Sequence, residues 1–368
     1  MTQTATDERF MALALALGRR GQGVAWPNPA VGCVIVRNGR IIGRGSTAPG
    51  GRPHAETVAL EQAGALADGA TAYVTLEPCS HHGRTPPCAE ALVRAGISRV
   101  VAPIEDSNPR VSGQGFAMLR GAGIEVVTGV GCRAALRDHT GFLMRIEQGR
   151  PMVTLKLASS FDGRIATRSG ESRWITGPEA RRLVHGLRAN HDAVLVGAGT
   201  ARADDPSLTV RDLGISRQPV RVVASRHLDL PLIGDLARSA AEVPLWLCHG
   251  SGVDPERTRA WEGLGARLIS CTVTGGQIDT ADMLRRLGDA GLTRVLCEGG
   301  GALAASLLAA DLVDELVGFT AGLTIGGDGR AMIGAMGITQ LAQAARFDLS
   351  ETRAVGGDVM HRWLRREG

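Results

Sequence analysis

The sequence predicts two α/β domains joined by a short linker. A chain of 368 residues is longer than one hydrophobic core usually organises. Short apolar runs rich in valine alternate with segments of helical periodicity, a pattern typical of sheets covered by helices. Gln148-Gly149-Arg150-Pro151 interrupts this alternation and has the composition of a linker. We therefore expect a first domain over residues 1–147 and a second over residues 148–368.

The first domain is expected to be an α/β layer sandwich. Residues 7–20 have apolar side chains at helical spacing, acidic residues at the start and arginines at the end, a distribution that complements the helix dipole. Arg37-Asn38-Gly39-Arg40 joins two apolar runs, and Asn-Gly is a strong signal for a two-residue hairpin turn. Strands are expected at 31–36, 41–45, 72–76, 99–102 and 124–127, and helices at 55–63, after Pro86-Pro87, at 115–121 and at 133–147.

The second domain is expected to contain a largely parallel sheet covered on both faces. Its strand-like runs alternate with helical segments, as in βαβ units. The expected strands are 152–157, 193–196, 220–224, 245–248, 267–270 and 295–297, and the expected helices are 178–189, 281–290 and 302–309. No repeat relates this half of the sequence to the first.

Composition and charge exclude several classes of protein. Aromatic residues make up 3% of the chain, too few for the stacking platforms that bind single-stranded nucleic acid. The net charge of +4 is compatible with a phosphorylated substrate but is too weak to indicate nucleic acid. The apolar runs are shorter than the ~20 residues of a membrane span, and the start of the chain lacks the basic region of a secretory signal. Seven scattered cysteines indicate free thiols and metal ligands, so we expect a cytoplasmic protein.

His54, Cys79 and Cys88 form a candidate catalytic zinc site. Neutral imidazole and two thiolates suit tetrahedral Zn²⁺, and three protein ligands leave the fourth position for water. Zinc lowers the pKa of such a water towards neutrality. Glu56 follows His54 by two residues and is placed to carry a proton from that water to a leaving amine. Helix N-termini, where His54 and Cys88 are expected, also favour thiolates.

Simpler interpretations of this site remain open. It could be a structural zinc closed by a fourth ligand such as Cys33, His81 or His82, or it could bind no metal. The loop between Cys79 and Cys88 carries both histidines and an arginine. That loop is either solvated or in contact with a substrate.

Cys297-Glu298-Gly299-Gly300-Gly301-Ala302 is a candidate phosphate-binding loop in the second domain. It follows an expected strand and opens an expected helix. Consecutive glycines let a ligand approach the backbone, and a helix N-terminus favours an anion. The same glycines also suit a tight structural turn, so the loop alone does not decide between the two.

Several motifs of the first half together resemble one enzyme family. They are Asn28-Pro29-Ala30-Val31-Gly32-Cys33, Pro53-His54-Ala55-Glu56, Glu77-Pro78-Cys79-Ser80-His81, Thr85-Pro86-Pro87-Cys88 and Asn108-Pro109. They resemble the deaminase half of the bifunctional riboflavin-biosynthesis deaminase/reductase family, of which the long interval between the two cysteines is characteristic. The resemblance implies a cytidine-deaminase-like α/β/α fold, zinc on the three ligands, and Glu56 as the proton shuttle. Asn28 and Asn108 would frame the pocket, although each Asn-Pro is equally compatible with a simple turn.

The second half resembles the reductase half of the same family, which has a dihydrofolate-reductase-like fold. The matching segments are 156–165, 172–176, 197–200 and 204–211, together with the glycine loop. The resemblance implies NADPH contacts by Ala158, Trp174, Thr200, Asp204, Ser225, Gly300, Gly301, Ala302, Leu303, Ala304, Ala305 and Ser306. It implies substrate contacts by Ser172, Arg188, Leu208, Arg211 and Glu298. The two arginines offer planar forks for a sugar phosphate, and Glu298 can accept hydrogen bonds from sugar hydroxyls or a pyrimidine edge. Lys156 and Asp204 are candidates for organising charge or protons around hydride transfer.

The resemblance as a whole implies an enzyme of riboflavin biosynthesis with one zinc ion per chain and NADPH as cofactor. It would deaminate 2,5-diamino-6-(5-phosphoribosylamino)pyrimidin-4-one and then reduce the ribosyl group of 5-amino-6-(5-phosphoribosylamino)uracil to ribityl. A homo-oligomer is expected, with a dimer favoured. The alternatives are a nucleic-acid base deaminase with an appended binding domain and a non-catalytic, zinc-stabilised binding module. The first of these would need a basic stripe and stacking aromatics, which the composition does not show.

Overall fold

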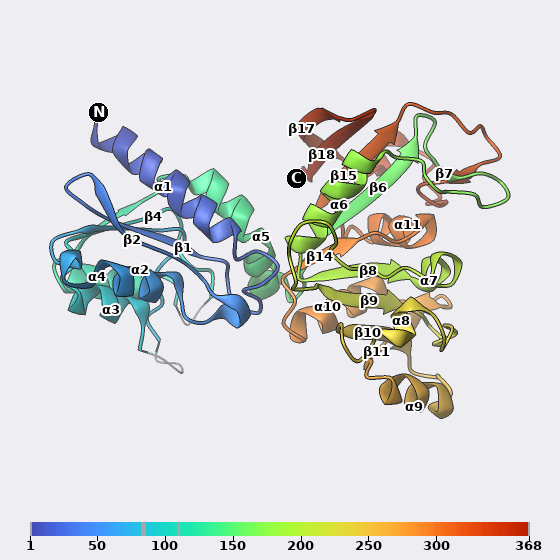
Figure 1. The fold of residues 1–368 in the computed structure, drawn as a ribbon, viewed down its shortest axis with the longest axis horizontal. Coiled ribbons are helices and arrows are strands. Elements are labelled where there is room, and N and C mark those ends of the chain that lie inside the picture. The colour runs from blue at the N-terminus through green and yellow to red at the C-terminus, as the bar shows by residue number, and fades with distance from the viewer. Residues whose placement is uncertain (1, 82–85, 109–110, 367–368) are drawn as a thin grey trace. The chain divides into compact units, whose positions relative to one another are not determined.

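The computed structural model describes residues 2–81, 86–108 and 111–366 (Figure 1). The chain divides into two compact units, unit 1 (Met1–Gly149) and unit 2 (Arg150–Gly368). Each unit has its own sheet and its own buried apolar cluster. Within the described ranges, no helix is long and apolar enough to cross a membrane.

Unit 1 is the α/β layer sandwich that the sequence predicts. Its strands are β1 (Gly32–Arg37), β2 (Arg40–Ser46), β3 (Thr71–Val74), β4 (Arg99–Ala102) and β5 (Glu125–Thr128). Its helices are α1 (Gln3–Arg19), α2 (Ala55–Ala63), α3 (Cys88–Arg94), α4 (Gln114–Gly121) and α5 (Cys132–Gln148). The sheet has the order β2-β1-β3-β4-β5, in which β1 pairs antiparallel with β2 and β3, and β3, β4 and β5 run parallel. α1 and α5 lie on one face of this sheet, and α2, α3 and α4 lie on the other (Figure 1).

The predicted Asn38-Gly39 hairpin turn is confirmed. Arg37 pairs with Arg40 across the turn, and both central residues have positive φ, 50° for Asn38 and 74° for Gly39. Asn and Gly are the residues that adopt this conformation most readily, which is why the pair fixes a two-residue turn here.

The expectation that acidic residues complement the dipole of the first helix is wrong. α1 begins at Gln3, four residues before Asp7, and its N-cap is Thr2, whose hydroxyl accepts from the amide of Ala5 at 3.4 Å. Asp7 is buried, and its carboxylate accepts hydrogen bonds from Tyr73 and Arg99 at 2.8–2.9 Å. This residue therefore ties the helix to the sheet.

Unit 2 is built on a long sheet in the order β11-β10-β9-β8-β14-β6-β15-β18-β17. Its strands are β6 (Met152–Ser160), β8 (Ala193–Gly197), β9 (Val220–Ala224), β10 (Leu245–Gly250), β11 (Arg267–Cys271), β14 (Arg294–Cys297), β15 (Glu315–Ala321), β17 (Phe347–Val355) and β18 (Asp358–Arg365). From β11 to β15 all neighbours are parallel, as predicted, whereas β18 pairs antiparallel with β15 and β17. The strands β15, β17 and β18 were not predicted.

Helices connect the parallel strands of unit 2. They are α6 (Pro178–Ala189), α7 (Ala198–Asp204), α8 (Asp235–Arg238), α9 (Pro255–Gly263), α10 (Thr280–Asp289) and α11 (Gly301–Ala309). Two short pairs lie outside the main sheet, β7 (Arg164–Ala166) with β16 (Arg330–Ala331) and β12 (Val273–Thr274) with β13 (Gln277–Ile278). The predicted helices at 178–189, 281–290 and 302–309 match α6, α10 and α11 to within one residue at each end.

Candidate active sites

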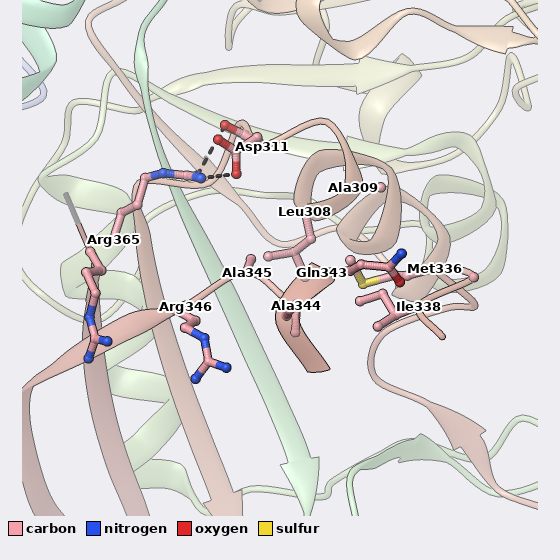
Figure 2. A pocket seen from close by; sticks show the side chains of 13 residues that line it. Leu308, Ala309, Asp311, Met336, Ile338, Gln343, Ala344, Ala345, Arg346 and Arg365 are labelled. Carbon is pink, nitrogen blue, oxygen red and sulfur yellow. Dashed lines mark hydrogen bonds and ion pairs between the residues drawn. The ribbon is translucent and has the colours of Figure 1, made fainter. Parts of the chain in front are cut away.

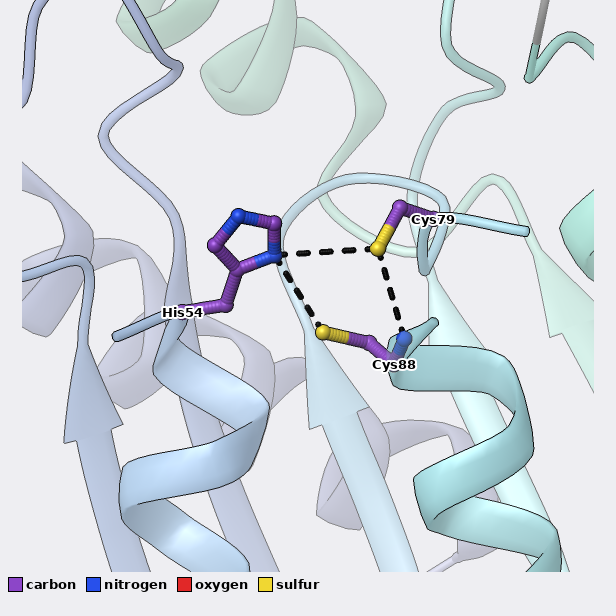
Figure 3. A group of neighbouring side chains, drawn as sticks. All are labelled: His54, Cys79 and Cys88. Carbon is purple, nitrogen blue, oxygen red and sulfur yellow. Dashed lines mark hydrogen bonds between the residues drawn. The ribbon is translucent and has the colours of Figure 1, made fainter. Parts of the chain in front are cut away.

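Three candidate metal ligands converge in unit 1 (Figure 3). His54 directly precedes α2, Cys79 lies in the loop after β3, and Cys88 is the first residue of α3. In Figure 3 the imidazole and the two sulfur atoms point towards one another from these three segments. Strand and helix ends that are distant in the sequence thus bring the predicted ligands together.

The distances among the ligand atoms fit a tetrahedral zinc ion. Nδ1 of His54 lies 3.3 Å from Sγ of Cys88 and 3.7 Å from Sγ of Cys79, and all three atoms lie within 4.8 Å of one another. Zn–S and Zn–N bonds of about 2.3 and 2.0 Å place a nitrogen and a sulfur about 3.5 Å apart at the tetrahedral angle. The residues present therefore fit zinc, bound through Nδ1 and two thiolates.

A fourth protein ligand is not found among the residues that the structure describes. Cys33 is buried and His81 is exposed, and neither belongs to the cluster of ligand atoms. His82 lies outside the described residues. Three ligands with an open fourth position are typical of catalytic rather than structural zinc.

Glu56 lies in the first turn of α2 and is 4% exposed. Burial, and next the negative charge of Cys79, raise the pKa of its carboxyl to about 7. A carboxyl with a pKa near neutrality can both accept and release a proton. The hydrogen bond from Cys88 lowers the pKa of the Cys79 thiol to about 4, so Cys79 is a thiolate at neutral pH.

Glu77 holds the loop that precedes α4 beside the metal ligands. Its carboxylate accepts hydrogen bonds from the backbone amides of Asp106, Gly113 and Phe116 at 3.0–3.1 Å. Asp106 accepts one from the amide of Asn108 at 2.8 Å, and burial raises the pKa of Asp106 to about 6. Sequence reasoning missed Glu77 and Asp106 in this role, since their partners are backbone atoms brought close only by the fold.

Asn28 is joined to the segment that leads to His54. Its side-chain amide donates to the carbonyl oxygen of Gly51 at 3.1 Å. A Cβ atom at position 51 would lie 2.1 Å from Nδ2 of Asn28, so the close approach requires glycine. The pocket roles of Asn28 and Asn108 stay predictions.

The residues predicted to contact NADPH gather along the carboxyl ends of the parallel strands of unit 2. Ala158 lies near the end of β6, Thr200 follows β8, and Ser225 follows β9. Gly300 directly precedes α11, which includes the predicted residues from Gly301 to Ser306. The amide of Gly300 donates to Oγ1 of Thr200 at 3.1 Å. Ligands of parallel α/β sheets bind outside this edge of the strands.

Two further predicted NADPH contacts, Trp174 and Asp204, lie on exposed segments. Trp174 is 67% exposed, and the guanidinium of Arg181 lies 4.4 Å from the centre of an indole ring. Arg173 donates to the backbone oxygen of Asp204 at 3.3 Å, which links the end of α7 to the segment that carries half-buried Ser172.

Arg188, Glu298 and Lys156 form a charged cluster in unit 2. Nε and Nη2 of Arg188 donate to the two carboxylate oxygens of Glu298 at 2.6 and 3.0 Å. Nη1 of Arg188 donates to the carbonyl oxygen of Thr209 at 2.8 Å, and Nζ of Lys156 lies 3.9 Å from Glu298. Only the remaining N–H bonds of Arg188 are open to a phosphate, so Glu298 and a sugar phosphate would share its guanidinium.

The charged groups in this cluster shift one another's pKa values. Burial by itself would raise the pKa of Glu298, but Arg188 and then Lys156 outweigh it and hold that pKa below its usual value. Burial lowers the pKa of Lys156, against the opposing effect of Glu298. Lys156 is also the only lysine in the sequence. Burial favours the neutral amine of a lysine, a form that a guanidinium does not adopt in proteins.

Leu208 and Arg211, the other predicted substrate contacts, lie on the segment after α7. Leu208 is buried and has a φ of 54°, and Arg211 is exposed. The backbone amide of Arg211 donates to Nδ1 of His185 at 3.3 Å, and the side chain of Gln218 contacts the backbone of Val210. Sequence reasoning did not single out His185 or Gln218.

A separate cavity of about 550 Å³ lies at the end of α11 (Figure 2). Leu308, Met336 and Ile338 provide apolar surface, and Arg346 and Arg365 add positive charge. Arg365 is already paired with Asp311 (Figure 2). The lining residues include none of the predicted substrate or NADPH contacts, so this cavity is not part of the candidate reductase site.

Comparison with known proteins identifies both halves. The family model described as "Cytidine and deoxycytidylate deaminase zinc-binding region" matches residues 4–103, and that described as "RibD C-terminal domain" matches residues 151–361. The fold and the sites thus define a bifunctional enzyme of riboflavin biosynthesis, with a zinc-type deaminase and a reductase in one chain. Riboflavin biosynthesis protein RibD of Escherichia coli (strain K12) is 42% identical, over 96% of this chain and 98% of its own length. The chain belongs to the RibD family.

Solved structures agree with this assignment. RibD of Acinetobacter baumannii (form 1) has a TM-score of 0.88 at 39% identity, covering 99% of this chain and 100% of its own. A diaminohydroxyphosphoribosylaminopyrimidine deaminase/5-amino-6-(5-phosphoribosylamino)uracil reductase from Thermotoga maritima has a TM-score of 0.86 at 32% identity, with coverages of 99% and 100%. The predicted family, fold class and enzyme class are confirmed, and the nucleic-acid deaminase alternative finds no support.

Proposed function

We propose that the chain catalyses two consecutive steps on one phosphorylated pyrimidine. It deaminates 2,5-diamino-6-(5-phosphoribosylamino)pyrimidin-4-one, and it then reduces the ribosyl group of 5-amino-6-(5-phosphoribosylamino)uracil to ribityl with NADPH. Residues 1–147 carry the first step and residues 148–368 the second. The observation that supports this most directly is the cluster of three ligand atoms beside the buried carboxyl of Glu56.

In the deaminase half, His54, Cys79 and Cys88 hold one zinc ion per chain. When bound, zinc supplies a Lewis acid that makes water nucleophilic at neutral pH. Glu56 accepts a proton and delivers it to the amino group that leaves as ammonia, a role that suits its pKa of about 7. Asn28 and Asn108 hold the pyrimidine in the pocket.

In the reductase half, NADPH supplies the hydride. The start of α11 fits its phosphate groups, because the N-cap is Gly300, which has no side chain to bond the first amides of the helix. Ala158, Trp174, Thr200, Asp204, Ser225 and the residues of α11 from Gly301 to Ser306 hold the rest of the cofactor. Glu298, oriented by Arg188, accepts hydrogen bonds from ribosyl hydroxyls. Lys156 balances charge or supplies a proton, and Ser172, Leu208 and Arg211 complete the substrate site.

The enzyme works as a cytoplasmic homodimer. All seven cysteines of the sequence lie in the described residues and none of them is in a disulfide, which supports a reducing compartment. Light scattering coupled to size-exclusion chromatography tests the assembly, and a monomer mass at micromolar concentration would overturn it.

The decisive experiment is incubation with the diaminopyrimidine phosphate, with and without NADPH, followed by mass analysis. Without NADPH, the product should have an oxygen in place of an amino group. With NADPH, it should gain two hydrogens more. Glu56→Ala should abolish the first change and leave reduction of the added uracil intermediate intact. A substrate that stays unchanged in the zinc-loaded wild type would refute the assignment.

A further inference from the structure

The segment from Asp205 to Arg211 has a backbone that needs outside support. Asp205 and Leu208 have φ values of 40° and 54°, in the left-handed region, which aspartate tolerates but which a bulky residue such as leucine rarely adopts. Leu208 is nevertheless buried, at 3% exposure. Such residues persist only where the surroundings determine the conformation, and they concentrate at functional sites.

Side-chain hydrogen bonds hold the segment on both sides of Leu208. Oδ1 and Oδ2 of Asp205 accept from the amide of Asp235 at 2.9 and 3.1 Å, and the hydroxyl of Ser207 donates to Oδ2 of Asp235 at 2.9 Å. Gln218 bonds Val210 twice, with Oε1 accepting from its amide at 2.6 Å and Nε2 donating to its carbonyl at 3.1 Å. These two hydrogen bonds resemble those that a residue in a β-strand makes with a residue of the neighbouring strand.

His185 adds a hydrogen bond at the Arg211 end. Because a backbone amide can only donate, Nδ1 of His185 accepts from Arg211 N at 3.3 Å, and the ring proton is then on Nε2. The nearby carbonyl of Thr209, 3.2 Å from the same Nδ1, is satisfied instead by Nη1 of Arg188 at 2.8 Å. His185 and Arg188 are three residues apart on α6, so they lie on the same face of this helix.

One face of α6 therefore positions both the Glu298 carboxylate and the backbone of the 207–211 segment. Arg188 orients the carboxylate of Glu298, and His185 fixes the backbone that presents Leu208 and Arg211. We propose that His185 and Gln218 are positioning residues for substrate binding in the reductase, which hold the 207–211 segment in its binding conformation. This inference rests on the proposed function, because it takes Leu208 and Arg211 as substrate contacts.

The test compares variants that remove or retain the acceptor. His185→Leu removes the acceptor of the Arg211 amide, and Gln218→Glu keeps its size but turns a donor into an acceptor that faces the Val210 carbonyl. Each should raise KM for 5-amino-6-(5-phosphoribosylamino)uracil by about fivefold, the effect of one hydrogen bond, and should leave kcat within about twofold. His185→Gln, whose carbonyl oxygen can accept, should restore KM. KM for NADPH and the rate of deamination on the same chain should not change.

These measurements decide whether His185 and Gln218 are positioning residues. An unchanged substrate KM in both His185→Leu and Gln218→Glu overturns the inference, as does a fall in kcat that His185→Gln does not reverse. If His185→Leu fails to fold, Gln218→Glu decides by itself. Failure of the proposed function looks different, because the wild-type chain would then not reduce the uracil substrate at all.

Discussion

Arg188 and Glu298, which are 110 residues apart in the sequence, form a two-point ion pair with donor–acceptor distances of 2.6 and 3.0 Å. The guanidinium is the main group that holds the pKa of this buried carboxylate below its usual value, so that the carboxylate keeps its charge. The pair therefore sets both the orientation and the charge of the group that we propose to contact the ribosyl hydroxyls.

Glu298→Gln should disable reduction and destabilise unit 2. The substitution leaves the buried guanidinium without a counter-ion, which costs about 3–5 kcal/mol when one partner of a buried pair is removed. We expect the reductase kcat/KM to fall at least about 100-fold, measured by NADPH oxidation. Glu262→Gln, at an exposed position on α9, is the control. Near wild-type reduction by Glu298→Gln would contradict the proposed role.

Glu56→Gln should remove deamination while the chain keeps its zinc. The amide has the shape of the carboxylate but cannot accept the proton, so the rate of ammonia release should fall about 10²- to 10⁴-fold. Glu61→Gln, an exposed position on the same helix, should behave as wild type. Loss of zinc from Glu56→Gln, measured by plasma mass spectrometry, would show that Glu56 belongs to the metal site itself.

Cys79→Ser should lower the zinc content from about one ion per chain to near zero. A serine hydroxyl is a poor zinc ligand beside the thiolate that it replaces. The matched control is Cys132→Ser, because Cys132 is a free cysteine at the start of α5 and outside the metal cluster. Both variants should still reduce the uracil intermediate. Full zinc occupancy in Cys79→Ser would rule out this ligand set.

Lys156→Arg should impair reduction even though it preserves charge. The lowered pKa of Lys156 makes its ammonium a better proton donor, whereas an arginine at this place stays charged and is larger. We expect at least a tenfold lower kcat with NADPH and an unchanged rate of deamination. Arg285→Lys, on the exposed side of α10, is the control for a change between the two basic residues. A wild-type kcat in Lys156→Arg would exclude proton exchange by this residue.

His191 should make the stability of unit 2 depend on pH. Burial lowers the pKa of its imidazole to about 4, so below the usual value of about 6.5 the unfolded chain binds the proton and the folded one does not. The free energy of unfolding should therefore fall as the pH falls from about 6.5 to 4, by about 2 kcal/mol between pH 7 and pH 5. Urea unfolding followed by the fluorescence of Trp246 and Trp261, which are buried in unit 2, measures it.

The difference between His191→Gln and wild type isolates this effect from other titrating groups. The difference in the free energy of unfolding between the two proteins should shrink towards pH 5, since glutamine takes up no proton. His227→Gln, at an exposed position, is the control for the change from histidine to glutamine. Parallel pH profiles for His191→Gln and wild type would contradict the prediction.

The metal site could be predicted because its information is local. His54 and Glu56 are two residues apart, and each ligand lies next to a strand or helix boundary that proline or apolar periodicity marks in the sequence. The parallel strands of unit 2 could be predicted for a similar reason, since strands buried on both faces are continuous apolar runs.

The edge strand β17 could not be predicted in this way. β17 is mostly exposed and carries charged residues such as Asp348, Glu351 and Arg353, so it lacks the apolar run of the central strands. It lies at the edge of the sheet, where pairing with β18 rather than burial stabilises it.

Contacts between residues far apart in the sequence could not be predicted either. The sequence marks Arg188 as a basic residue on a helix, but its pairing with Glu298 appears only when β14 and α6 are folded together. The same holds for Asp7, whose partner Arg99 lies on β4. The position of His185, three residues before Arg188 on a helix, was the one local sign that could have drawn attention to it.

The separate cores of the two units have a genetic consequence. A chain with a disabled deaminase and a second chain with a disabled reductase each retain one intact site, so two such alleles in one cell should complement each other. Co-expression of Glu56→Gln and Glu298→Gln should relieve a riboflavin requirement that neither variant relieves alone. The degree of relief would measure how freely the uracil intermediate leaves one chain and reaches another.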